Sequence, residues 1–188
     1  MENTIAKHYE EVKKYHPEYL EAVEKLGDHK PAGPLRGGKY SAFDGGTRVV
    51  FISRWTGEIE PGISDALFSQ VDLMASLAKL VGQTLPQSSG PDSQDYLNAL
   101  IGKSETGREW VIEQSGNSRL SIIKGNWKYI EPGPGDKISA NTNIELGNDT
   151  LPQLYDLRTD IGEMNNVAAD NPAIVNELSE LLKSIKEQ

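Results

Sequence analysis

The sequence predicts a mixed fold, in which an α/β region is followed by an α+β region that ends in a helix. A β-branched run and an amphipathic segment occupy the first half, and short strand-like runs separated by Gly-Asn turns occupy the second. The 188 residues, 37% of them hydrophobic, are enough for one core or two small packed lobes. We therefore expect an N-terminal helical segment over 1–26, an α/β region over 27–95 and an α+β subdomain over 96–188.

The first elements are a helical segment and a loop. Ile5, Tyr9 and Val12 follow one another at i, i+4 and i+7, which is typical of one face of a helix. Glycine and proline are frequent from residue 27 to residue 46, so we expect a loop there.

A strand and a second helix should follow this loop. Val49–Trp55 is β-branched and aromatic, which predicts a buried strand. Asp65–Val81 is predicted to be a helix because apolar residues recur along one face, and Gly82 is the expected residue after its end. The apolar residues are Leu67, Val71, Met74, Leu77 and Leu80 or Val81. The segment 83–95, rich in Ser, Pro, Gly and Gln, is interpreted as a linker between two lobes.

The second half contains several short strand-like runs. Trp110–Gln114, Leu120–Lys124 and Trp127–Ile130 are separated by Gly-Asn turns, which favours an antiparallel meander. Glu131–Asp149 is long and polar, and we expect it to be an excursion over the surface.

The chain ends in a well-marked helix. Asn171 can cap its N-terminus, and Pro172 suits its first turn. An apolar stripe along this helix indicates core packing. The stripe consists of Ile174, Val175, Leu178, Leu181, Leu182 and Ile185.

The composition argues against several classes of function. With 28 Asp plus Glu against 19 Lys plus Arg, the net charge of -9 disfavours binding to nucleic acid or to an anionic membrane surface. No apolar run has the length of a membrane span. The absence of cysteine excludes disulfides, thiolate zinc sites and a cysteine nucleophile. The 3 histidines show no ligand spacing, so we predict no metal ligands in this chain.

One loop concentrates positive charge in this acidic chain. Arg36, Lys39 and Arg48 lie among glycines that let the backbone approach an anion, which makes the loop a candidate anion site.

The same loop partly fits a different motif. The spacing from Gly33 to Lys39 matches a phosphate-binding P-loop, but Tyr40 stands where Ser or Thr should hold magnesium. Residues 43–46 are also not expected to open a helix, which further disfavours a nucleotide site.

Short motifs occur in a fixed order along most of the chain. They are PLRGGK at Pro34–Lys39, DGGTRV at Asp44–Val49, FISRWTGEIEPG at Phe51–Gly62, Ser64-Asp65 with Gln70–Leu73, KGNWKY at Lys124–Tyr129, and Leu154–Leu157 with Asp160, Glu163 and Asn165-Asn166. In this order they resemble the C-terminal portion of arylsulfatase-type sulfatases, in the alkaline-phosphatase-like superfamily. The corresponding family segments have the forms LRGxK…EGGxRxP, WPG, SD…VDLxxTL, RxGxWKY and LYDLxxDxxExxN.

The resemblance implies a fold and a set of site residues. The fold would be the tail of the sulfatase α/β catalytic domain, followed by a small antiparallel-sheet subdomain with a terminal helix. Lys39 would contact the sulfate oxygens and the formylglycine, which makes it the candidate catalytic residue. Arg36 and Arg48 are candidate substrate-binding residues beside Lys39. Arg48 is also expected to hold the loop in place. For Arg36, both loop packing and contact with the anion remain possible roles. Asp44 replaces the usual glutamate and is expected to be structural.

The departures from the family pattern predict that the chain alone is inactive. It contains no nucleophile motif, and the family's calcium ligands and general-acid histidine belong to upstream segments. Calcium and formylglycine are therefore implied for the full-length family, with no cofactor in this chain. We expect no turnover by the chain alone, because catalytic groups that act as a unit fail together.

The resemblance also implies partners. These are a sulfate ester or sulfated glycan and the missing N-terminal half of the sulfatase. Val49–Trp55 should belong to a larger sheet, and its open edges would favour a homo-oligomer unless residues 1–26 cover them. The alternative function is a noncatalytic module that binds sulfated glycans or other anions. A periplasmic or secreted location is what the family implies.

Overall fold

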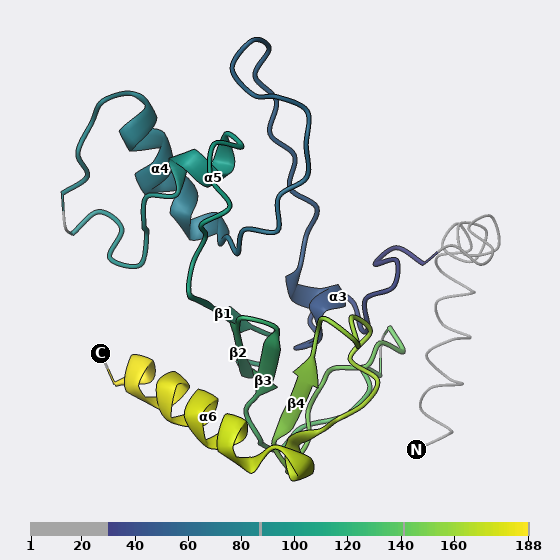
Figure 1. The fold of residues 1–188 in the computed structure, drawn as a ribbon. Helices are drawn as coiled ribbons and strands as arrows, with labels where there is room; N and C mark the ends of the chain where they lie inside the picture. Colours follow the sequence, from purple (N-terminus) through teal and green to yellow (C-terminus); the bar gives the residue numbers. More distant parts are fainter. Residues whose placement is uncertain (1–29, 87, 141, 188) are drawn as a thin grey trace, which may run out of the picture. The chain divides into compact units, whose positions relative to one another are not determined.

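The computed structural model describes residues 30–86, 88–140 and 142–187, in two compact units (Figure 1). Among these residues, unit 1 comprises 30–48, 113–121 and 126–187, and unit 2 comprises 49–112 and 122–125. The helix predicted over 1–26 lies outside the described residues. The predicted division of the chain into segments 1–26, 27–95 and 96–188 stays a prediction.

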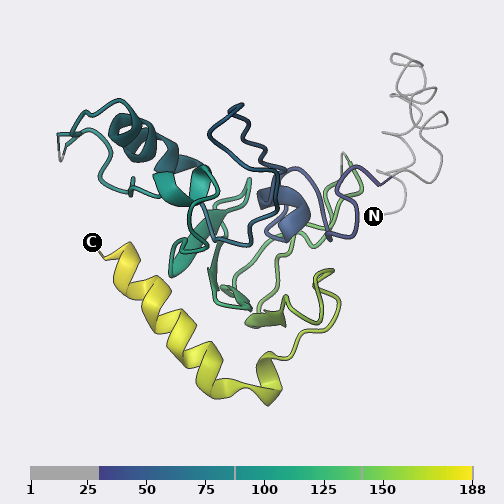
Figure 2. The same cartoon turned by 45° about the horizontal axis from the view of Figure 1, so that its top comes forward.

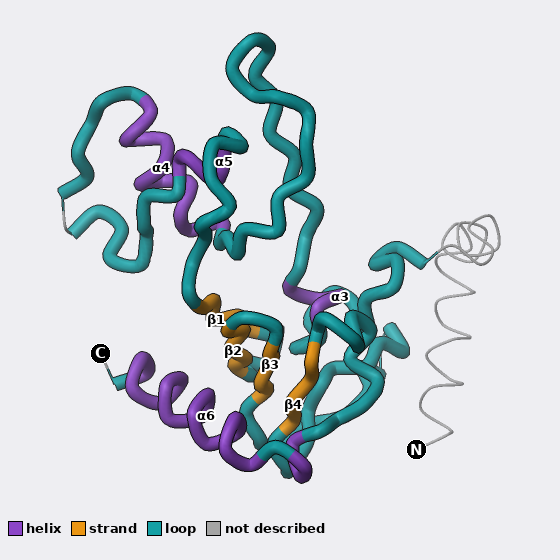
Figure 3. Tube along the Cα trace, viewed as in Figure 1, coloured by secondary structure: helices purple, strands orange, loops and turns teal. Residues whose placement is uncertain are grey.

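The strands form a four-stranded sheet in the order β1-β2-β3-β4, shown in orange in Figure 3. β1 (Trp110–Gln114), β2 (Leu120–Lys124) and β3 (Trp127–Ile130) have the bounds predicted from the sequence. β4 (Gln153–Asp156) pairs antiparallel with β3, with Trp127 opposite Asp156. β4 was not predicted as a strand from the sequence, where Leu154–Leu157 stood out only as part of a family motif.

The predicted terminal helix is present as α6 (Pro172–Lys186), drawn in yellow in Figure 2. Leu178 and Leu182 are buried, and α6 contacts β3. Pro172 occupies the first turn as expected, but the predicted side-chain cap by Asn171 is wrong. The Asn171 amide instead donates to the Val167 carbonyl at 2.9 Å, across the 3₁₀ turn η2 (Ala168–Asp170).

The apolar core of unit 1 joins the candidate anion loop to the sheet. Ala42 and Phe43, just after Lys39 in the chain, are buried with Ile130 and Tyr155. The rings of Phe43 and Tyr155 meet edge to face, with centroids 6.1 Å apart. The glycine-rich loop is therefore anchored from one side by burial of its own hydrophobic residues.

In unit 2 the predicted helix over Asp65–Val81 is shorter than expected. The helical part consists of η1 (Gln70–Asp72) and α4 (Leu73–Leu80), with a further turn of helix at α5 (Leu97–Leu100). Helical structure begins late because Ser69 and Asp72 form a reciprocal capping box. No helix in the described part of the chain is long and apolar enough to cross a membrane.

The end of α4 confirms the role predicted for Gly82. Gly82 has φ 69°, its N–H donates to the Lys79 carbonyl at 3.1 Å, and the Gln83 N–H donates to the Ala78 carbonyl at 2.8 Å. These two hydrogen bonds are those of a Schellman motif.

The buried strand predicted at Val49–Trp55 is absent. The segment is loop (Figure 3), and Val50 and Ile52 are 88% and 83% exposed. A β-branched run becomes a strand only when a neighbour accepts its backbone hydrogen bonds, and no described segment pairs with this one.

Candidate functional site

The candidate site is the folded segment 33–48, which we call the Lys39 loop. It ends in one turn of helix, α3 (Asp44–Thr47), so the expectation that residues 43–46 would not open a helix was wrong. A Cβ on Gly45 would lie 2.9 Å from the Gly37 carbonyl carbon, and a Cβ on Gly46 would lie 2.9 Å from the Ser41 nitrogen. The two glycines therefore let α3 pack directly against the rest of the Lys39 loop. These contacts outweigh the low helix propensity of glycine.

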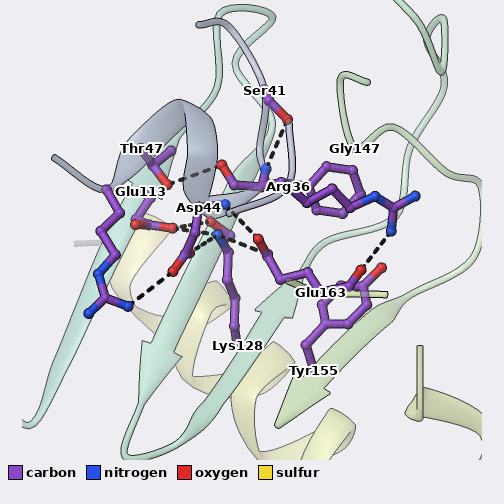
Figure 4. A network of polar contacts seen from close by, with 12 residues as sticks. Arg36, Ser41, Asp44, Thr47, Glu113, Lys128, Gly147, Tyr155 and Glu163 are labelled. Atoms are coloured by element: carbon purple, nitrogen blue, oxygen red, sulfur yellow. Dashed lines mark hydrogen bonds and ion pairs between the residues drawn. The ribbon is translucent and has the colours of Figure 1, made fainter. Parts of the chain in front are cut away.

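A buried charge cluster holds α3 from the other side (Figure 4). It consists of Asp44, Glu113 at the end of β1, Lys128 in β3, and Glu163. The Lys128 Nζ lies 2.5 Å from Asp44 Oδ1, 3.0 Å from Glu113 Oε2 and 3.2 Å from Glu163 Oε1. The backbone N–H of Asp44 also donates to Glu163 Oε2 at 2.6 Å. Asp44 is thus structural, as predicted. Lys128 and Glu163 were not predicted as site residues, because in the sequence they stand only as parts of family motifs.

The electrostatics of the cluster follow from deep burial. Asp44, Lys128 and Glu163 are 0% exposed. Burial alone would lower the pKa of Lys128, but the three surrounding carboxylates raise it above its usual value. Burial raises the pKa of Glu163 to about 7, although the nearby Lys128 ammonium acts to lower it.

Arg36, one of the predicted substrate-binding residues, braces the loop. Its Nε and Nη2 donate to the Glu145 carboxylate at 2.8 and 2.7 Å, and its Nη1 donates to the Glu163 carbonyl at 2.6 Å. Its guanidinium carbon lies 4.1 Å from the centroid of the Phe43 ring. The bond to Glu145 raises the pKa of Arg36 and lowers the pKa of Glu145. A contact of Arg36 with substrate stays a prediction.

Arg48 lies at the C-terminal end of α3. Its backbone N–H donates to the Asp44 carbonyl at 2.8 Å, and its Nη1 lies 3.6 Å from Asp44 Oδ2. More than half of its side chain is exposed, so it is tied to the buried charge cluster while facing solvent. Its substrate-binding role is likewise untested.

Lys39, the predicted catalytic residue, differs from both arginines. It is exposed, and no carboxylate in the described part of the chain pairs with its ammonium. Its Nζ lies 5.1 Å from the centroid of the Tyr40 ring. The structure thus connects Arg36 and Arg48 to the buried charge cluster, and leaves the Lys39 ammonium available to an external anion.

The described residues do not fit the calcium and formylglycine that the resemblance implies. No three acidic or histidine residues in this part of the chain form a metal site. The carboxylates of Asp44, Glu113 and Glu163 already surround the Lys128 ammonium. The sequence has no cysteine that could be oxidised.

Comparison with known proteins places these features in a family. Residues 8–83 match the family model described as Sulfatase. An N-acetylgalactosamine-6-O-sulfatase of Bacteroides thetaiotaomicron is 53% identical over 166 residues, which are 88% of this chain and 32% of that protein. Arylsulfatase A of Homo sapiens is 29% identical over 166 residues, which are 80% of this chain and 32% of that protein. The chain thus spans about a third of the length of these relatives.

Solved structures agree with the sequence matches. A structure from Bacteroides thetaiotaomicron, described in connection with the metabolism of multiple glycosaminoglycans, has a TM-score of 0.86 at 53% identity. The match covers 89% of this chain and 35% of that chain. A sulfatase structure from Pseudoalteromonas sp. has a TM-score of 0.66 at 21% identity and supports the fold alone, over 82% of this chain and 32% of that chain.

These matches show that the chain has the fold of the alkaline-phosphatase-like superfamily. Within it, the chain belongs to the sulfatase family and corresponds to the C-terminal portion of the arylsulfatase type. The predicted fold class is confirmed by the small antiparallel sheet and the terminal helix.

Proposed function

We propose that this chain forms the C-terminal part of a sulfatase, in which Lys39 contacts the sulfate group of the substrate. The proposed substrate class is a glycan carrying 6-sulfated N-acetylgalactosamine. This substrate follows the activity for which the 53% identical Bacteroides relative is named.

The observation that carries the proposal is the contrast among the three cations of the Lys39 loop. Arg36 and Arg48 have carboxylate partners within the described residues, whereas the Lys39 ammonium is exposed and has none there. A loop that is braced on both sides and presents one lysine is suited to binding an anion at a fixed position.

Lys39 would act by electrostatic stabilisation. A sulfate ester gains charge on its departing oxygen as the S–O bond breaks, and a nearby ammonium stabilises that charge. The sequence contains no sulfatase nucleophile motif, and it has no cysteine from which formylglycine could form. The chain alone is therefore expected to bind sulfate without turning over a sulfate ester.

Sulfate-dependent thermal unfolding tests this function. A ligand that binds only the folded state raises the unfolding midpoint as its concentration rises. We expect sulfate to raise the midpoint of the wild-type chain and to have no effect on Lys39→Ala. Lys137→Ala is the matched control, because Lys137 is an exposed lysine paired with Asp149, and it should respond as the wild type does. An equal sulfate response in Lys39→Ala would contradict the proposal.

A further inference from the structure

Tyr40, the residue after Lys39, has an unusual backbone conformation. Its φ is 80°, in the region that favours glycine, and its side chain has β-carbon and ring atoms that make this region costly. A bulky residue is kept in such a conformation only where the surrounding structure enforces it, and such residues cluster at ligand sites.

The ring of Tyr40 rests on the turn between β1 and β2. The Gly116 N–H donates to the Tyr40 carbonyl at 3.1 Å. A Cβ on Gly116 would lie only 2.6 Å from Tyr40 Cδ1, so the ring lies directly against bare backbone. Tyr40 is nevertheless 52% exposed, which shows that the contact with the turn leaves much of the side chain open to solvent.

The surroundings of this ring are polar. Gly116, Asn117 and Ser118 on the adjacent turn are all exposed. The Lys39 Nζ lies over the ring, 5.1 Å from its centroid, so the ammonium and the aromatic ring form a cation–π contact. An aromatic ring that served only core packing would be buried, as those of Phe43 and Tyr155 are.

A sulfated sugar has both of the groups that such a pair would bind. Its sulfate is an anion suited to an ammonium, and one face of its pyranose ring presents C–H groups suited to the negative face of an aromatic ring. In a sugar sulfated on its exocyclic carbon, the two groups are neighbours and can contact adjacent side chains at once.

We propose that Tyr40 is the stacking platform for the pyranose ring of the sugar whose sulfate contacts Lys39. This inference rests on the proposed function, and it makes Tyr40 a determinant of specificity for sulfated sugars over other sulfate compounds.

Calorimetric titration of the chain with N-acetylgalactosamine 6-sulfate and, separately, with inorganic sulfate tests the inference. Tyr40→Gly should weaken binding of the sugar sulfate about three- to tenfold, the range expected for one aromatic contact, and leave binding of inorganic sulfate unchanged. Its unfolding midpoint should stay close to that of the wild type, because glycine relieves the strain at φ 80° while it removes the contact with Gly116. Tyr40→Phe keeps the flat ring and should bind as the wild type does.

Ser118→Gly is the matched control, because Ser118 also has a positive φ, of 64°, and glycine should change neither affinity there. If Tyr40→Gly weakens both ligands equally, or lowers the unfolding midpoint strongly, the ring is a packing residue and the inference is wrong. If Lys39→Ala abolishes binding of both ligands while Tyr40→Gly changes neither, the inference fails and the proposed function stands. If the wild type binds neither ligand, both fail.

Discussion

Lys128 lies at the centre of the buried charge cluster in unit 1. Its ammonium is fully buried and faces carboxylates from three separate parts of the chain: Asp44, Glu113 and Glu163. Removing one partner from such a cluster leaves uncompensated buried charge, which costs far more than losing a surface ion pair.

Lys128→Met should therefore destabilise the chain by about 3–5 kcal/mol, although methionine matches lysine in length. The free energy of unfolding in urea measures this change. Lys137→Met is the control, because 73% of the Lys137 side chain is exposed, and its loss should cost below about 1 kcal/mol. Similar small losses for both variants would show that Lys128 does not hold the Lys39 loop.

Glu163 should make stability depend on pH. Its pKa in the folded chain is about 7, above the 4.5 of a free glutamate, so folding favours its protonated form. The stability that this group contributes is fully present below pH 4.5 and is lost as the pH rises through 7. Glu163→Gln cannot titrate and should flatten the decline of unfolding free energy between these pH values. An unchanged slope in Glu163→Gln would contradict this assignment.

This cluster could be predicted from the sequence only in part. Lys128 appears there as a cation in a strand of otherwise aromatic and apolar residues, which is a local signal of an unusual site. Its partner Asp44 lies 84 positions away, and only the folded backbone brings the two together. Spacing along the chain carries no information on that contact.

The helix α3 depends on how closely it can approach the rest of the Lys39 loop. Its two glycines place backbone where a side chain would otherwise collide with Arg36, Gly37 and Ser41. The neighbours are mostly main-chain atoms, which cannot move aside as a flexible side chain can.

Gly45→Ala should therefore destabilise unit 1 by about 2–3 kcal/mol, even though alanine is the better helix former. Thermal unfolding followed by circular dichroism measures the change. At Gly162 an added Cβ would make ordinary contacts of 3.4 and 3.6 Å, so Gly162→Ala should change stability by less than about 0.5 kcal/mol. A stabilising effect of Gly45→Ala would mean that propensity, and not close approach, governs α3.

Elements encoded by local pattern were predictable, and elements that need a distant partner were not. The strands β1, β2 and β3 follow from apolar runs separated by Gly-Asn turns, and α6 follows from its periodic stripe. Val49–Trp55 has equally strong β propensity but lacks a neighbouring strand among the described residues, so it stays extended loop.

For the molecule as a whole, the decisive fact is that the chain spans about a third of its relatives' length. Unit 2 exposes several large apolar side chains, including Val50, Ile52 and Ile63, which is unusual for a complete globular surface. If this chain forms the C-terminal part of a sulfatase, as proposed, we expect the N-terminal part to cover them. Association of the chain with itself through Val49–Trp55 stays a prediction.

The candidate site, too, could be predicted from the sequence only in part. The order of motifs identified Lys39 as the residue that would contact sulfate, together with Arg36 and Arg48. The sequence could not show which of the three cations has a carboxylate partner, because that depends on where Glu145 and Asp44 lie in the folded chain.

The most direct test of the sulfate-contact role is a chimera in which this chain replaces the corresponding C-terminal portion of the 53% identical Bacteroides sulfatase. Its kcat/KM on N-acetylgalactosamine 6-sulfate would be measured with and without Lys39→Ala. We predict an active chimera that loses on the order of 100-fold in kcat/KM with Lys39→Ala, the scale expected for one group that stabilises developing charge. A chimera that remains equally active with Lys39→Ala would contradict the role assigned to this lysine.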